Sequence, residues 1–218
     1  YVYNTFYFDD TPVQARLGRQ VVNWGESLYI QGINQINPLD VPALRRPGTE
    51  LKEALIPVWM GYLNIGLPAG ISMEAFYQLK YESTEVEGCG HYWSVTESNI
   101  GQSFGDCDVG ALLGGAGTSA DRVNSGRYVP QYKGDKPSDS GQWGLSFRIP
   151  VDALDGEVGL YYMNYHSRTP YLSVRNGNPG SPKQFDGAQS VVVGATGQTP
   201  GPAWEYPEDI RLFGASFT

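Results

Sequence analysis

A strict alternation of apolar and polar side chains between Ile71 and Glu82 limits the fold of this chain more than any other feature. The segment reads ISMEAFYQLKYE, so Ile, Met, Ala, Tyr, Leu and Tyr alternate with Ser, Glu, Phe, Gln, Lys and Glu. Because successive side chains of a β-strand point to opposite faces, this pattern predicts a strand with one apolar and one mostly polar face. Residues 53–65 form the preceding arm of a hairpin, which the turn sequence GLPAG closes. The apolar face needs a partner, which is either a protein core or lipid.

Seven segments in all have a strand pattern. They cover residues 1–8, 13–25, 53–65, 71–82, 142–149, 157–171 and 210–217. The alternation breaks near Arg19, where either a bulge or an inward-facing charge would explain it. In the connection after the second strand, a short helical turn is expected at 40–46 with Asp40 as its N-cap.

The connections between these strands are alternately short and long. The long ones are 26–52, 87–141 and 172–205. Outer-membrane β-barrels have this arrangement, with short turns at one end and long external loops at the other. Aromatic residues near the predicted strand ends fit the girdles at membrane interfaces; they are Trp24, Trp59, Tyr62, Tyr81, Trp143 and Tyr171. We therefore predict an all-β fold, an antiparallel transmembrane β-barrel in the bacterial outer membrane, with its apolar faces against membrane lipid.

Seven strands do not close such a barrel, because bacterial single-chain barrels have an even number. An open sheet would also leave backbone groups unpaired in hydrocarbon. Residues 1–218 are thus expected to be part of a single outer-membrane β-barrel domain that is incomplete at both ends. The chain begins with Tyr1 and shows no signal peptide, which agrees with this expectation.

Composition excludes some classes of function. The formal net charge is −8, whereas a protein that binds nucleic acid would present a basic face. No stretch approaches the roughly 20 apolar residues of a membrane-spanning helix. The mean hydropathy is only −0.34, but alternating strands hide their apolar face from such an average.

The two cysteines, Cys89 and Cys107, lie in the same Gly-, Ser- and Asp-rich connection. A pair is too small for a tetrahedral Cys site, and neither residue belongs to a C-x-x-C motif. A disulfide closing this loop is predicted, which implies an oxidising compartment. The alternative is two unrelated free thiols.

Several short motifs between Arg16 and Thr84, together with the segment 206–217, resemble a Gram-negative outer-membrane family known only as a domain of unknown function, with members called adhesin-like or porin-like. The motifs are RLGRQ, NWGE, INPLD, ALRRPG, EAFYQL and the final YPEDIRLFGASF. The resemblance implies a longer, signal-bearing precursor that folds as a β-barrel. It also implies a resistance-nodulation-division transporter and a lipoprotein-like protein as partners, and hydrophobic or lipid-like molecules as cargo.

If the apolar faces meet lipid, the polar faces line the barrel interior. The predicted pore-lining residues are Glu74, Gln78, Lys80, Glu82 and Arg148. They form either a channel wall that selects solutes or a plugged interior whose charges pair with one another.

An arginine pair, Arg45 and Arg46, lies in the first long connection. If this connection folds into the interior, the pair either forms a constriction that binds anionic groups or pins the loop to wall carboxylates such as Glu74.

Catalytic motifs are absent from the sequence. The only histidines are His91 and His166, and neither an H-E-x-x-H nor a G-x-S-x-G pattern occurs. Asp106, Asp108 and Asp121 lack the spacing of an EF-hand calcium loop. We therefore expect no enzyme, metal or cofactor. The first hypothesis is a channel or export component of the outer membrane; the alternative is a surface-binding or adhesin-like barrel whose long loops bind a partner.

Overall fold

The computed structural model describes two compact units separately. The described residues are 1–9, 11–24, 34–87, 121, 132–133, 136–175 and 201–218. The first unit comprises Tyr1–Thr84, Pro137–Arg168 and Pro207–Thr218, and the second comprises Glu85–Lys136 and Thr169–Tyr206.

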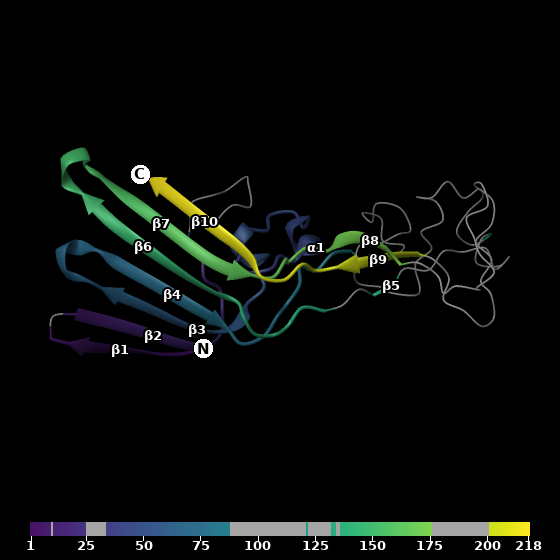
Figure 1. Cartoon of the computed structure of the whole chain (residues 1–218), viewed down its shortest axis with the longest axis horizontal. Helices are drawn as coiled ribbons and strands as arrows, with labels where there is room; N and C mark the ends of the chain where they lie inside the picture. Colours follow the sequence, from purple (N-terminus) through teal and green to yellow (C-terminus); the bar gives the residue numbers. More distant parts are fainter. Residues whose placement is uncertain (10, 25–33, 88–120, 122–131, 134–135, 176–200) are drawn as a thin grey trace. The chain divides into compact units, whose positions relative to one another are not determined.

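The first unit is built on a seven-stranded antiparallel sheet (Figure 1). In spatial order its strands are β1 (Val2–Phe8), β2 (Thr11–Gln20), β3 (Val58–Gly66), β4 (Ser72–Gln78), β6 (Trp143–Val151), β7 (Gly156–Tyr165) and β10 (Ile210–Phe217). Each strand pairs with the one before it in this order, and every pairing is antiparallel. The all-β prediction and the seven predicted strands are confirmed. The sheet is not closed: β1 and β10 are its edges within the described residues.

The short connections are tight turns, and all of them lie at the same end of this sheet. Between β3 and β4 the turn contains the 3-10 helix η2 (Pro68–Gly70), where Ala69 and Gly70 adopt left-handed φ values of 62° and 73°. Between β6 and β7 it contains η3 (Asp152–Leu154). The long connections leave from the opposite ends of the strands, so the predicted alternation of connections is confirmed.

The predicted helical turn is also confirmed. The helix α1 (Val41–Leu44) begins after Asp40, whose Oδ1 accepts a hydrogen bond of 2.9 Å from the backbone N–H of Ala43. The 3-10 helix η1 (Leu51–Glu53) follows it.

The second predicted strand, 13–25, was too long at its C-terminal end. The strand ends at Gln20 because the Asn37 side chain takes over its pairing. The Asn37 Oδ1 accepts from the backbone N–H of Val22 at 3.0 Å, and its Nδ2 donates to the Gln20 carbonyl at 3.3 Å. Neither the bulge nor the inward charge explains the break, since the Arg19 side chain is exposed and donates to the Pro57 carbonyl. The chain instead turns back over the sheet.

Two other predicted strands differ at their ends. The strand predicted at 53–65 begins at Val58, and the one predicted at 157–171 ends at Tyr165. The His166 ring ends the latter: its Nδ1 accepts from the backbone N–H of Asp209 at 3.1 Å, and its Nε2 lies 2.9 Å from the Ser140 carbonyl.

The second unit contains a small three-stranded sheet in connections predicted as loops. Its strands are β5 (Tyr132–Lys133), β8 (Tyr171–Arg175) and β9 (Gly201–Glu205), in the order β5-β9-β8. β9 pairs in parallel with β5 and antiparallel with β8. The pairing of β5 with β9 covers only two residues, which is too short to leave a periodicity in the sequence.

The core of the first unit lies on one face of the seven-stranded sheet. We call this the inner face, and we call residues 21–24 and 34–57, which fold over it, the inner segment. The buried cluster between them consists of Val22, Trp24, Ile36, Val58, Met60, Tyr62, Phe76, Tyr161 and Met163. The inner segment covers part of this face.

Candidate functional site: the two faces of the seven-stranded sheet

The opposite, outer face of the sheet carries an almost continuous apolar surface across all seven strands. The strand register aligns its side chains in three rows. From β1 to β10 they are Phe6, Val13, Ile65, Met73, Phe147, Leu160 and Ala215; then Asn4, Ala15, Leu63, Ala75, Leu145, Tyr162 and Phe213; then Val2, Leu17, Gly61, Tyr77, Trp143, Asn164 and Arg211. The polar members, Asn4, Asn164 and Arg211, all lie in β1, β7 or β10.

None of these outer-face side chains is buried. Phe213 is 76% exposed and Leu79, just beyond the end of β4, is 51% exposed, while Met73 and Phe147 are half-buried. Among the described residues, therefore, no protein core covers the outer face. A monomeric soluble protein rarely exposes an apolar surface of this extent.

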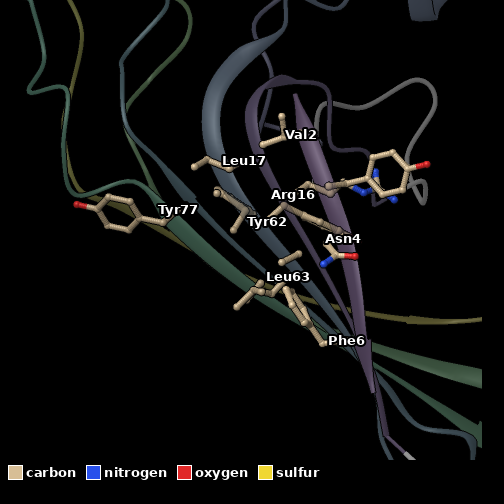
Figure 2. A pocket seen from close by; sticks show the side chains of 13 residues that line it. Val2, Asn4, Phe6, Arg16, Leu17, Tyr62, Leu63 and Tyr77 are labelled. Carbon is tan, nitrogen blue, oxygen red and sulfur yellow. The ribbon is translucent and has the colours of Figure 1, made fainter. Parts of the chain in front are cut away.

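The outer face is hollowed over β1 to β4 into a shallow groove of about 580 Å³ (Figure 2). The small residues Ala15, Gly61 and Ala75 form its floor, and larger apolar side chains such as Leu17 and Leu63 form its walls. The groove thus continues the apolar surface, and Arg16 is the one charged residue among those that line it.

The inner face is held by directional contacts instead, and the centre of these contacts is Trp24. The indole N–H of Trp24 donates to Glu74 Oε2 at 3.0 Å, and its backbone carbonyl accepts from Arg148 Nη2 at 3.4 Å. Its ring lies 5.3 Å from the Phe76 ring and 5.8 Å from the Tyr161 ring, measured between centroids. Trp24 is completely buried.

A glycine of β6 makes room for this indole. A Cβ atom placed on Gly144 would lie 2.5 Å from the Phe76 ring and 2.8 Å from the Trp24 ring. Only glycine fits there without displacing one of the two rings, so the backbone of β6 forms one wall of the Trp24 site.

Of the predicted pore-lining residues, Glu74, Gln78 and Arg148 lie on the inner face, where two of them bind Trp24. Gln78 is fully buried and donates to the Ile36 carbonyl at 2.6 Å. Lys80 and Glu82 follow the end of β4 and form an ion pair at 2.7 Å. The structure therefore brings three of the five to one surface and leaves the other two beyond the strand.

The arginine pair lies after α1, with both side chains exposed. Arg45 is the C-cap residue of the helix. The Glu74 carboxylate, the wall group suggested for this pair, accepts from Trp24. The hydrogen bonds that hold the inner segment include those of Trp24, Asn37, Gln78 and Arg168.

Arg168 is a further polar residue of this region that the sequence did not identify as a candidate. It is 4% exposed, and all of its donors bind carbonyl oxygens. Nε donates to Gln35 at 3.3 Å, Nη1 to Glu82 at 3.2 Å, and Nη2 to both Ile36, at 3.1 Å, and the side-chain carbonyl of Gln78. Burial lowers the pKa of Arg168 to about 10, so it remains a cation at neutral pH. No local pattern marks it, because its partners are distant in sequence.

Some inner-face polar groups are buried without a partner in the described structure. They include Ser146 Oγ and Arg148 Nε, which come from adjacent inward positions of β6. Ser146 is 0% exposed. Buried polar atoms of this kind normally have a hydrogen-bond partner, so both atoms could bind a further polar group.

The predicted aromatic girdle is partly wrong. Trp24 and Tyr62 are buried in the inner-face cluster, and Tyr81 is buried beyond the end of β4, where its hydroxyl donates to the Ser167 carbonyl. Trp59 and Trp143 are exposed on the outer face, as a girdle requires. Tyr171 belongs to β8 of the second unit and is exposed.

Some predicted residues lie outside the described part of the chain. They are Cys89, Cys107, His91, Asp106 and Asp108, so the disulfide stays a prediction. Within the described residues, no cluster of three or more His, Cys, Asp or Glu side chains could hold a metal ion. No helix in the same residues has the length and apolar character needed to cross a membrane.

Comparisons with curated proteins and with solved structures give no match. A family model does match, and it covers residues 1–218. Its description is "Protein of unknown function (DUF1302)". The chain therefore belongs to the DUF1302 family of proteins of unknown function.

Proposed function

We propose that the seven-stranded sheet is part of the wall of a β-barrel in the bacterial outer membrane, and that the protein moves small or hydrophobic, lipid-like solutes across that membrane. The observation that carries the proposal is the uncovered apolar surface of the outer face. Hydrocarbon is the partner that suits a surface with so few charges, because a Lys or Arg at mid-membrane on such a face costs roughly 2–4 kcal/mol.

The position of the polar residues supports the same orientation. Charged side chains of the central strands, such as Glu74 and Arg148, lie on the inner face, and the outer face of β2 to β6 is apolar in all three rows. In a barrel the inner face encloses the interior, which is polar whether or not it conducts. The edges β1 and β10 would pair with further strands, since unpaired backbone groups are costly in hydrocarbon.

The cargo and partners in this proposal come from the family resemblance. They are hydrophobic or lipid-like molecules, handed on in cooperation with a resistance-nodulation-division transporter and a lipoprotein-like protein. The aromatic character of the inner face, with Trp24, Phe76 and Tyr161 in one cluster, agrees with apolar cargo.

Reconstitution tests the proposal directly. The full-length protein is inserted into planar lipid bilayers for conductance, and into vesicles for the flux of a fluorescent fatty acid and of a sugar of similar mass. We expect fatty-acid flux above that of protein-free vesicles. Correct insertion without conductance or flux of either solute would refute transport.

The inner segment, which fills part of the inner face, favours a second function, a barrel with a blocked interior that binds partners through its external loops. Deletion of residues 88–120 separates the two. If the protein is a transporter, the flux should persist after the deletion. If it is a binding protein, the deletion should abolish attachment to a surface partner, and neither the deletion variant nor the wild type should show flux.

A further inference from the structure

The site that holds Trp24 has the composition of a ligand site. Its two flanking rings, Phe76 and Tyr161, offer tilted aromatic contacts, and the missing side chain of Gly144 leaves the room that the Trp24 ring fills. Glu74 offers a charged acceptor and Arg148 a charged donor on the two sides of that space. We call these five residues the indole cradle.

The cradle has more hydrogen-bonding capacity than Trp24 uses. Trp24 satisfies Glu74 with one N–H and Arg148 with one carbonyl, and the latter contact, at 3.4 Å, is long for a hydrogen bond. Arg148 Nε and the fully buried Ser146 Oγ are left without partners. Such groups cost free energy unless something binds them, so they point to a ligand with more oxygen atoms than Trp24 has.

Trp24 is also fastened less firmly than the rest of the inner segment. Its side chain makes one hydrogen bond, whereas two hydrogen bonds from Arg168 and one from Gln78 hold Gln35 and Ile36 in place. Much of the free energy that holds Trp24 is apolar burial, and another flat ring of similar size would recover it. Exchange of Trp24 for a ligand therefore leaves the Arg168 contacts intact.

We propose that the indole cradle is a binding site for the cargo, that Trp24 occupies it when cargo is absent, and that the ligand is a flat, fused-ring amphipathic molecule. One edge of that molecule donates an N–H or O–H to Glu74, and an oxygen-bearing group accepts from Arg148 and Ser146. The inference rests on the proposed function for the identification of the ligand as cargo. The chemical class of the cargo would then be that of flat, fused-ring amphipathic molecules.

The test is equilibrium binding to the full-length protein in detergent, with N-acetyl-L-tryptophanamide as the probe because it reproduces the Trp24 ring and a carbonyl. Wild type should bind it weakly, since Trp24 fills the cradle. Trp24→Ala should bind it at least tenfold more tightly. Gly144→Val and Glu74→Leu, each added to Trp24→Ala, should return binding to the wild-type value. Equal binding by Trp24→Ala and by either double variant, all folded by circular dichroism, overturns the inference.

Trp24→Ala removes a fully buried ring, which costs roughly 3–5 kcal/mol and could prevent folding. A second measurement uses wild type labelled with 5-fluorotryptophan, with the Trp24 line in the fluorine spectrum assigned by Trp24→Phe. On titration with the probe, the Trp24 line should move towards the solvent-exposed position, whereas the Trp143 line should not. A Trp24 line that stays fixed up to the solubility limit of the probe overturns the inference.

These outcomes separate the two proposals. Binding to Trp24→Ala in a protein that shows no flux leaves the cradle standing and refutes transport. Flux in a protein whose cradle binds nothing refutes the cradle alone.

Discussion

The two faces of the seven-stranded sheet are built from the same strands but are stabilised in different ways. From β2 to β6 the outer face offers one kind of contact, apolar and non-directional, across three rows of side chains. The inner face depends on particular pairs such as Trp24 with Glu74 and Arg168 with Gln78. From this difference we expect that exchanging one apolar side chain for another on the outer face changes stability little, whereas a charged side chain there lowers it. On the inner face, loss of a single hydrogen-bonding group should already lower stability.

The largest expected effect is that of a charge on the outer face. Leu145→Arg should lower the free energy of unfolding in phosphocholine vesicles by roughly 2–4 kcal/mol, because Leu145 lies in the central row of the apolar surface. Leu79→Arg is the matched control at the strand end, where the cost should fall to about 0–1 kcal/mol. Denaturant titration of the full-length protein measures both. Equal costs at the two positions would contradict a lipid-facing outer surface.

The second-largest loss of stability is expected on removal of the buried Arg168 side chain. Arg168→Met leaves the buried Gln78 carbonyl without its donor, at a cost of about 1–3 kcal/mol. The control Arg19→Met removes an exposed arginine that also donates to a carbonyl, and should change stability by no more than about 0.5 kcal/mol.

The double variant Arg168→Met with Gln78→Met sharpens this test, since it removes both partners. Its cost should be less than the sum of the single costs. Additive costs would show that the two side chains do not act as a pair.

One substitution, glycine to alanine, compares the two faces directly. Gly144→Ala forces the new Cβ into the Trp24 and Phe76 rings and should cost about 1–3 kcal/mol. Gly61→Ala on the outer face meets only a Leu17 atom at 4.0 Å, so its effect should be within about 0.5 kcal/mol. Unfolding in denaturant gives both values. A larger loss of stability in Gly61→Ala than in Gly144→Ala would contradict the expected difference between the two faces.

The smallest expected effect concerns the start of α1. Asp40→Ala removes the N-cap hydrogen bond to Ala43 and should cost about 1 kcal/mol. Hydrogen exchange at the Ala43 amide should accelerate accordingly, while exchange in the central strands stays unchanged. Glu50→Ala, which removes an exposed ion pair with Lys52, serves as control and should leave that amide protected.

Much of the strand arrangement could be predicted, because it depends on local pattern. The alternation in 71–82 places Met73 and Tyr77 on one face and Glu74 and Gln78 on the other, and the strand register agrees. The Asp40 cap was also predictable, since the N-cap residue and its partner are three positions apart.

The candidate site could be predicted only in part. Glu74 and Arg148 were identified as inward-facing, but nothing local indicates that Trp24 lies between them, since Glu74 is 50 residues and Arg148 124 residues away in sequence. The aromatic character of Trp24 suggested an interface position instead. Arg168 carries no periodic pattern at all, and its bonds to Gln35 and Ile36 span 133 and 132 residues.

The order of the amino acids was enough to predict the seven strands of the large sheet, their two chemically different faces and the alternation of short and long connections, because each depends on residues close together in the chain. The folded chain was needed to show which side chains meet on the inner face and that residues 21–24 and 34–57 cover part of it. The physical reason is that apolar burial depends on residue type, which the sequence displays, whereas a hydrogen bond needs two particular atoms about 3 Å apart, which chain folding alone brings together.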